Sequence, residues 1–176
     1  MWRSGAAGVD GERFEDIEAY ELDRWFGELA QEPKEKSYKP EAARLVFIPK
    51  QSGSRFRPLS IPTIRDRTAQ TAAKLVVEPI LEADPPDEQH GYRPERSALT
   101  AVTQVHRLLN SGYTHVVDAD LSAYFDTVPH AELLQCVARR VVDRQMLYLI
   151  KMWLETSRST WKVSKRGLLP PSGSYR

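Results

Sequence analysis

The chain has a single cysteine, Cys136, among its 176 residues, so it has neither an internal disulfide nor a metal site built from several cysteines. It also contains no P-loop, no glycine-rich dinucleotide fingerprint and no H-E-x-x-H pair among its 4 histidines. No internal repeat is present. These absences exclude disulfide scaffolds and repeat arrays, and the 41% hydrophobic content indicates a globular domain. Because Cys136 lies in an apolar helical pattern, we expect it in the core.

Long hydrophobic runs are absent as well. No apolar stretch reaches the roughly 20 residues that span a bilayer, and the first residues, Trp2-Arg3-Ser4-Gly5, lack the apolar segment of a signal peptide. We therefore expect a cytosolic protein with no membrane partner.

The formal net charge is only +1, but the basic residues are grouped. Residues 44–67 carry six basic side chains against one acid, and residues 139–176 carry nine against two. Two positive surfaces on an otherwise acidic body are typical of proteins that bind nucleic acids or nucleotides. Solvated faces carry such charge too, so the pattern leaves both interpretations open.

Hydrophobic periodicity predicts a chain of helices interrupted by one hairpin. Residues 44–50 and 55–62 form two strands joined by the turn Gln51-Ser52-Gly53-Ser54. Helices are expected from about Asp10 to Ala30, from Thr63 to Leu81, after Ser97 with an inner face of Leu99, Val102, Val105 and Leu109, from Pro129 to about Val141, and from Met146 to Leu154.

The hairpin places Lys50 and Arg57 on opposite sides of its turn, where we expect them to lie near each other. A compact ammonium beside a bidentate guanidinium suits a triphosphate. Positive residues on an exposed hairpin also serve solubility and protect strand edges, so this second interpretation stays open.

A second chemical pattern lies in residues 116–126, where carboxylates and then aromatic residues follow a short β-branched run. His115 to Ala119 reads as a short buried strand, in which Asp118 and Asp120 project from the same face. Two carboxylates suit Mg²⁺, which takes few protein ligands and completes its shell with water and phosphate. Tyr124 and Phe125 would then form a wall beside the metal. Alternatively, Asp120 caps a helix or turn and the aromatic residues belong to the core.

Together these motifs resemble the reverse transcriptases encoded by bacterial group II introns. The likeness runs from about Gly5 to Gly167. The segments that carry it are Gly5-Ala6-Ala7-Gly8-Val9-Asp10-Gly11, Phe47-Ile48-Pro49-Lys50, Arg57-Pro58-Leu59-Ser60-Ile61-Pro62-Thr63-Ile64-Arg65-Asp66-Arg67, residues 75–82, His90-Gly91-Tyr92-Arg93-Pro94 with Arg96-Ser97-Ala98, and residues 116–130.

The resemblance implies a role for several of these residues. Asp120 matches the first of three metal-binding aspartates, with the backbone carbonyl of Leu121 as a second ligand for Mg²⁺. Phe125 matches the side chain that checks the sugar of the incoming nucleotide. Lys50 and Arg57 match the residues that hold its triphosphate, and Arg65, Arg67 and Arg93 match positions that support template or nucleotide.

The implied fold class is α+β: reverse-transcriptase fingers and a partial palm, rich in helix, with a β-hairpin and a short catalytic palm strand. We expect an N-terminal helical extension at 1–40, fingers at 41–112, part of the palm at 113–168 and a tail without family likeness at 169–176. The partners implied are an RNA template or intron RNA, a DNA primer and deoxynucleoside triphosphates.

The sequence departs from the family after Leu168. The proline-glutamine-glycine turn, the Y-x-D-D hairpin with the other two aspartates and the thumb do not follow, as in a frameshifted or prematurely ended copy. We therefore expect an incomplete active site, no DNA synthesis by this chain alone, and apolar faces left partly uncovered on the helices that contain Leu99 and Leu133.

Three functions follow from these patterns. The first is a fragment of an RNA-directed DNA polymerase that uses Mg²⁺ for nucleotidyl transfer. The second is a maturase-like module that binds intron RNA without catalysis. The third is a decayed remnant with no function. Asp120 matters only to the first.

Overall fold

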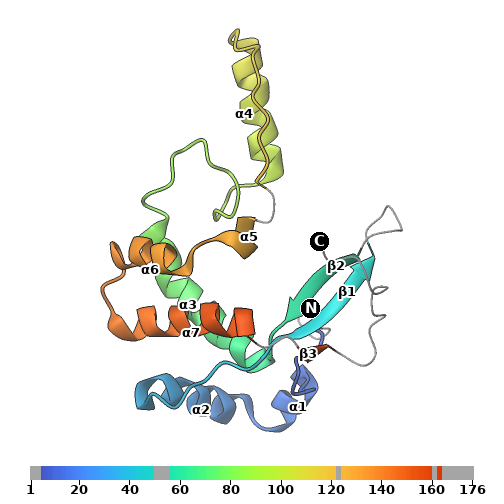
Figure 1. Ribbon diagram of the computed structural model, residues 1–176, viewed down its shortest axis with the longest axis vertical. Coiled ribbons are helices and arrows are strands. Elements are labelled where there is room, and N and C mark those ends of the chain that lie inside the picture. The colour runs from blue at the N-terminus through green and yellow to red at the C-terminus, as the bar shows by residue number, and fades with distance from the viewer. Residues whose placement is uncertain (1–4, 50–55, 122–123, 160–161, 164–176) are drawn as a thin grey trace. The chain divides into compact units, whose positions relative to one another are not determined.

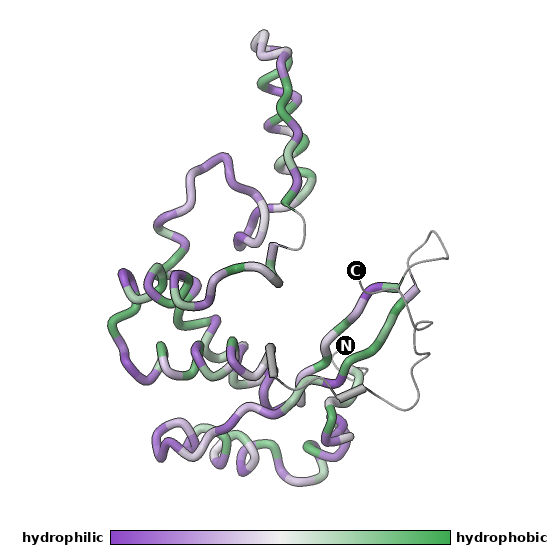
Figure 2. Tube along the Cα trace, in the orientation of Figure 1, coloured by the Kyte–Doolittle hydropathy of each residue, from purple (hydrophilic) through white to green (hydrophobic). Residues whose placement is uncertain are grey.

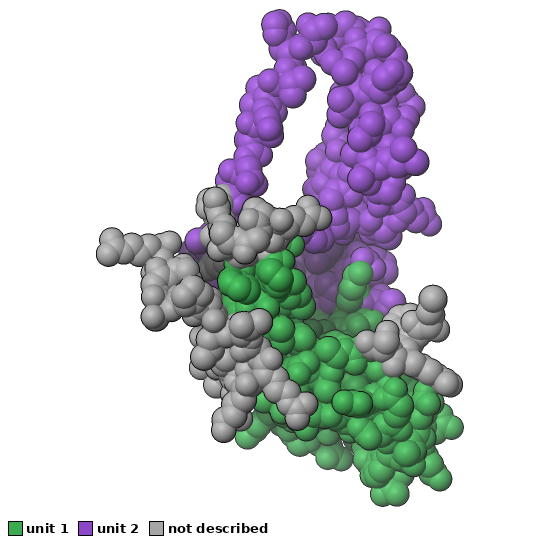
Figure 3. All heavy atoms as spheres, turned by 90° about the vertical axis from the view of Figure 1, so that its right-hand side faces the viewer, with its two compact units in different colours: residues 1–74, 142–176 green, residues 75–141 purple. Residues whose placement is uncertain are grey.

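The computed structural model describes residues 5–49, 56–121, 124–159 and 162–163 (Figure 1). The chain divides into two compact units: residues 1–74 with 142–176, called unit 1, and residues 75–141, called unit 2 (Figure 3). None of the described helices has the length and apolar character to cross a bilayer. The elements are α1 (Phe14–Ala19), α2 (Leu22–Glu35), β1 (Arg44–Pro49), β2 (Phe56–Ile61), α3 (Ile64–Leu81), α4 (Ala98–Asn110), α5 (Tyr124–Thr127), α6 (His130–Ala138), α7 (Arg144–Ser159) and β3 (Lys162–Val163).

The antiparallel pairing of the two predicted strands is confirmed, whereas the predicted turn Gln51-Ser52-Gly53-Ser54 lies outside the described residues. Strands β1 and β2 pair antiparallel from Arg44 opposite Ile61 to Pro49 opposite Phe56, and β3 pairs in parallel with the start of β1. The sheet order is therefore β2-β1-β3. A helix-rich chain with this small sheet agrees with the predicted α+β class.

The N-terminal helix differs from its prediction because it is broken in two. Helix α1 ends at Ala19, and Glu21 has a φ of 74°, which no helical residue adopts. Helix α2 then continues to Glu35, beyond the predicted end at Ala30, with Pro33 inside its last turns. Proline removes one helical hydrogen bond, and near the end of a helix few bonds remain to be lost.

The core of unit 1 is built on a buried carboxylate, Asp66, whose exposed fraction is 1%. Its Oδ1 accepts a hydrogen bond from the Tyr38 hydroxyl at 2.6 Å, and its Oδ2 accepts one from the backbone N–H of Glu41 at 2.9 Å. The Tyr38 oxygen in turn accepts a bond from Trp153 Nε1 at 2.9 Å. The network thus joins the α2–β1 connector, α3 and α7, in agreement with the rule that a buried charge must have hydrogen-bond partners.

The start of α3 is held by Thr63, which is also 1% exposed. Its Oγ1 accepts a hydrogen bond from the backbone N–H of Asp66 at 3.1 Å, which satisfies one of the free donors of the first helical turn. The carboxylate of Asp66 lies in that same turn, where the helix dipole favours negative charge. These two interactions explain why α3 begins directly after Thr63, close to its predicted start.

In unit 2 the cap of α4 is as predicted, because Ser97 Oγ accepts a bond from the Thr100 N–H at 3.2 Å. The predicted inner face of α4 is apolar (Figure 2), and it is uncovered, in line with the expectation for the helix that contains Leu99: no residue of α4 is buried, and Leu99, Val102 and Val105 are exposed. Cys136 is also exposed rather than in the core. In both cases periodicity identifies an apolar face, while burial requires a second surface to cover it.

Gly8 offers a test of the packing around Thr63. A Cβ added at Gly8 would lie 2.6 Å from the Thr63 Cα and 2.8 Å from its nitrogen, both backbone atoms that cannot turn aside. We expect Gly8→Ala to lower the free energy of unfolding by about 1–3 kcal/mol. The matched control is Gly27→Ala on α2, where a Cβ meets nothing within 4 Å; it should stabilise by about 1 kcal/mol through helix propensity. Urea unfolding that ranks the two variants equally would contradict this packing.

Tyr38→Phe tests the buried network, because it leaves Asp66 and the Trp153 N–H each without one partner. We expect a loss of about 1–3 kcal/mol in urea unfolding, against little change for Tyr20→Phe, whose hydroxyl is bonded to Glu28 at an exposed position. Burial and the bond to Asp66 raise the pKa of Tyr38 in the folded state. The parent should therefore lose stability above the unfolded tyrosine pKa of about 10, and Tyr38→Phe should lose less. Equal alkaline losses in the two proteins would count against the network.

Candidate functional site

The segment around Asp118 and Asp120 differs from its prediction. Residues 113–121 contain no strand, and Val116 and Val117 are exposed rather than buried, Val117 by 93%. A strand is held by hydrogen bonds to a neighbouring strand, and none of the described residues pairs with this segment. The prediction of a buried strand at 115–119 is therefore corrected to an exposed segment without regular structure.

Asp118 and Asp120 are both exposed on this segment. Across the described part of the chain, no group of three or more histidine, cysteine or acidic side chains is arranged to hold a metal ion. The donors at hand are the carboxylate of Asp120 and the backbone carbonyl of Leu121. Both are oxygen ligands of the kind that Mg²⁺ takes together with water and phosphate, so they fit this ion in chemical type.

Three exposed aromatic side chains come together in unit 2. The ring of Phe125 lies 5.9 Å from that of Tyr92 and 5.5 Å from that of Tyr124, both in edge-to-face geometry. Phe125 is 71% exposed and Tyr92 92%. The sequence placed Tyr124 and Phe125 side by side, but it gave no sign of Tyr92, which reaches them from a loop with a φ of 59°. Such exposed rings are suited to contact with a sugar or a base.

Arg57 lies on β2 opposite Ile48 and is exposed, so its guanidinium is accessible on the hairpin. Lys50 lies outside the described residues, and the predicted proximity of Lys50 and Arg57 stays a prediction. The two paired strands, β1 ending at Pro49 and β2 beginning at Phe56, are present.

Arg65 and Arg67 point inward to partners of their own within unit 1. Arg65 forms an ion pair with Glu32 and lies over the ring of Tyr38, 5.3 Å from its centroid. Arg67 donates to the carbonyl of Ala6 at 2.9 Å and lies 5.7 Å from the ring centroid of Phe14. Both guanidinium groups therefore tie the N-terminal segment to α3.

Arg93 is enclosed by its surroundings, with a side chain only 9% exposed. Its Nε and Nη2 lie 2.7 Å and 2.6 Å from Glu82 Oε1. Its Nη1 donates to the carbonyl of Pro86 at 2.7 Å and approaches that of Gln89 at 3.3 Å. The side chain fixes the loop between α3 and Tyr92.

A profile of the family described as reverse transcriptase (RNA-dependent DNA polymerase) matches residues 48–172 of this chain. The matched region includes β1 from Ile48 onward, β2, and the segment of Asp120 and Phe125.

Relatives of the chain include two proteins whose names refer to introns. Protein YkfC of Escherichia coli is 41% identical over 134 residues, which cover 74% of this chain and 32% of that protein. The group II intron-encoded protein LtrA of Lactococcus lactis is 31% identical over 146 residues, covering 82% of this chain and 24% of LtrA. The mitochondrial Nuclear intron maturase 1 of Arabidopsis thaliana is 30% identical over 96 residues. The chain thus spans a third or less of the length of these relatives.

Arg93→Lys tests whether Arg93 holds its loop in place. A lysine ammonium is a single compact charge and cannot reproduce contacts made by three guanidinium nitrogens. We expect the change to lower the free energy of unfolding by about 1–3 kcal/mol. Arg96→Lys is the control, since the ion pair of Arg96 is a 3.6 Å contact with the exposed Asp87, and the change should have little effect. Urea unfolding followed by circular dichroism compares them, and equal effects would refute the structural role of Arg93.

Proposed function

Since the chain belongs to the reverse transcriptase (RNA-dependent DNA polymerase) family, we propose that it forms the fingers and the first part of the palm of a group II intron-encoded RNA-directed DNA polymerase. The observation that carries this proposal is the family match over 48–172, which includes the end of β1, all of β2 and the Asp120 segment together. Residues 41–112 are assigned to the fingers and 113–168 to the palm, preceded by the extension at 1–40.

The hairpin is proposed to hold the triphosphate of the incoming deoxynucleotide. Arg57 offers an exposed guanidinium for two parallel hydrogen bonds to phosphate oxygens, and Lys50 adds a compact positive charge. Both residues come from the basic block at 44–67, which attracts polyanions before contact is made.

Phe125 is proposed to test the sugar of that nucleotide. Its exposed ring, held edge-on between Tyr92 and Tyr124, presents a flat apolar surface that a 2′-hydroxyl would contact unfavourably. This arrangement favours deoxyribose over ribose.

Asp120 and the carbonyl of Leu121 are proposed to hold Mg²⁺. When bound, the ion would neutralise charge on the phosphates and lower the pKa of the primer hydroxyl. Asp120 supplies the negative charge that attracts the cation to this segment, and its exposure leaves room for the phosphate oxygens and waters that complete an octahedral shell.

The arginines 65, 67 and 93 are proposed to support template or nucleotide through the elements that they hold. Their guanidinium groups are bonded within the protein, so their contribution is to fix the N-terminal segment and the Tyr92 loop. The partners proposed for the assembled protein are an RNA template or intron RNA, a DNA primer and deoxynucleoside triphosphates.

A second candidate function is binding of intron RNA without catalysis. It is favoured by the names of two plant relatives, Nuclear intron maturase 1 and 2. RNA binding of this kind rests on basic blocks and phosphates, so it should weaken steeply with salt. It needs Arg57 for charge and has no need of Asp120.

Two pairs of variants separate these functions. We expect Arg57→Ala to weaken binding of dTTP about ten-fold, the loss of one charge-assisted contact, while Arg139→Ala, which removes an exposed charge elsewhere, does not. Asp120→Asn should abolish the increase in dTTP affinity caused by Mg²⁺, and Asp118→Asn should keep it. Calorimetry measures dTTP binding, and fluorescence anisotropy measures binding of a labelled RNA hairpin.

The outcomes distinguish the candidates. Loss of Mg²⁺-dependent dTTP binding in Asp120→Asn, with RNA affinity kept within about two-fold, supports the polymerase assignment. RNA binding by a parent chain that takes up no dTTP would overturn that assignment and favour the second function.

A further inference from the structure

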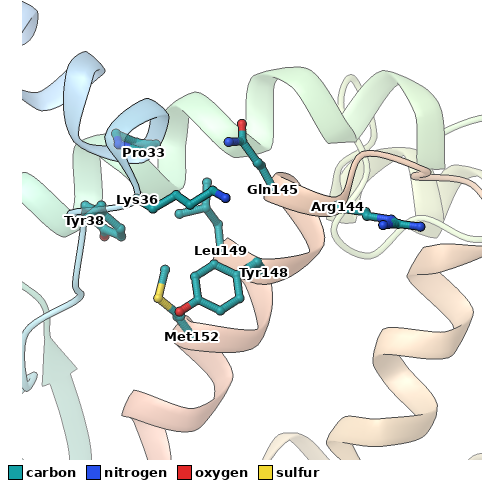
Figure 4. Close-up of a pocket in the computed structure, with 8 residues that line it drawn as sticks. All are labelled: Pro33, Lys36, Tyr38, Arg144, Gln145, Tyr148, Leu149 and Met152. Atoms are coloured by element: carbon teal, nitrogen blue, oxygen red, sulfur yellow. The ribbon is translucent and has the colours of Figure 1, made fainter.

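Unit 1 contains a cavity between the end of α2, the connector that follows it and α7 (Figure 4). Its volume is about 290 Å³. Small-molecule sites in proteins begin at roughly 300 Å³, so the cavity suits a small ligand. It includes none of the residues proposed for triphosphate, sugar or metal.

The wall of the cavity is mostly apolar. Pro33 contributes from α2, and Leu149, Met152 and the ring of Tyr148 contribute from successive turns of α7. Leu149 and Met152 are half-buried, and Tyr148 is exposed at the opening. Such a surface favours a hydrocarbon body, and the flexible thioether of methionine adapts to its shape.

The hydroxyl of Tyr38, which also lines the cavity, adds no charge. Tyr38 is buried, and its hydroxyl already donates to Asp66 and accepts from Trp153. Burial and the bond to Asp66 raise its pKa, so the hydroxyl stays neutral at physiological pH. The inner end of the cavity therefore offers a ligand an aromatic surface without a free hydrogen-bonding group.

Of the two basic residues among the described lining of the cavity, Lys36 is the one that points across the opening. Figure 4 shows its side chain extending from the connector toward Leu149 and Gln145 of α7, whereas Arg144 is directed away from the other lining residues. Lys36 is exposed and makes no ion pair among the described residues. Its backbone is fixed at the end of α2 with a φ of 57°, and its N–H donates to the carbonyl of Pro33.

We propose that this cavity binds a small amphiphilic carboxylate, with the hydrocarbon chain against Leu149 and Met152 and the carboxylate on the Lys36 ammonium. One cation beside an apolar cavity matches one monovalent head group. A nucleotide is excluded as the ligand, because its phosphates need several converging donors and its sugar needs polar partners. The charge at the opening and the apolar interior together define the ligand class.

Decanoate is the probe for this site, and the methionine methyl groups are the reporters. Protein labelled with ¹³C at the methionine methyls gives separate signals for Met152, which lines the cavity, and Met146, which does not. We expect decanoate to shift the Met152 signal to saturation and to leave the Met146 signal nearly unchanged. Met152→Leu assigns the signal.

Lys36→Asn removes the ammonium and retains a residue that tolerates the left-handed backbone at this position. We expect it to weaken decanoate binding at least about ten-fold. Lys34→Asn, an exposed lysine outside the cavity, is the matched control and should bind as the parent does. Decanol, which lacks the charge, should bind the parent at least about ten-fold more weakly than decanoate.

Each other outcome refutes the proposal. An unshifted Met152 signal would show that the cavity does not admit the chain. Equal affinity for decanol and decanoate, or equal weakening by Lys34→Asn and Lys36→Asn, would show that the Lys36 ammonium does not select the ligand. The binding of dTTP is measured in parallel, and because the two sites share no residue, its result does not decide this one.

Discussion

The burial of one carboxylate, that of Asp66, constrains most of unit 1. A buried charge is stable only if donors surround it, and here they come from Tyr38 and from the backbone of Glu41. Trp153 joins the network through the Tyr38 hydroxyl, so α7 is held to the same point. The glycine-rich N-terminal segment meets it too, because Gly8 packs against the backbone of Thr63. The hairpin ends two residues before Thr63 and is therefore fixed at its base.

This arrangement divides the arginines into two kinds. Arg65, Arg67 and Arg93 are bonded to groups of the protein itself and hold segments together. Arg57 projects from β2 into solvent. Bonds inside the protein hold the N-terminal segment through Arg67 and the loop before Tyr92 through Arg93. The basic block at 44–67 therefore contains arginines that hold structure, Arg65 and Arg67, and an exposed one, Arg57, for which we propose the binding role.

Local features were well predicted from the sequence, and features that depend on distant partners were not. The hairpin, the Ser97 cap and the helix beginning at Thr63 follow from residues near each other in the chain. The strand at 115–119 and the burial of Cys136 required surfaces from elsewhere in the chain, which periodicity does not reveal. The burial of Asp66 and the approach of Tyr92 to Phe125 depend on tertiary contacts, so no local sequence pattern predicts them. Local patterns pointed to Lys50, Arg57, Asp120 and Phe125, and family likeness added Leu121, Arg65, Arg67 and Arg93. The roles of all these residues stay predictions.

The most direct test of the proposed site is to find where a divalent ion binds. Mn²⁺ substitutes for Mg²⁺ in sites with oxygen ligands and broadens the NMR signals of nearby amides. In the presence of dTTP, we expect the backbone amides of Asp120 and Leu121 to broaden in the parent and in Asp118→Asn, and to stay sharp in Asp120→Asn. Broadening that is unaffected by Asp120→Asn, or that is centred on other acidic residues, would contradict the assignment of Asp120 as the metal ligand.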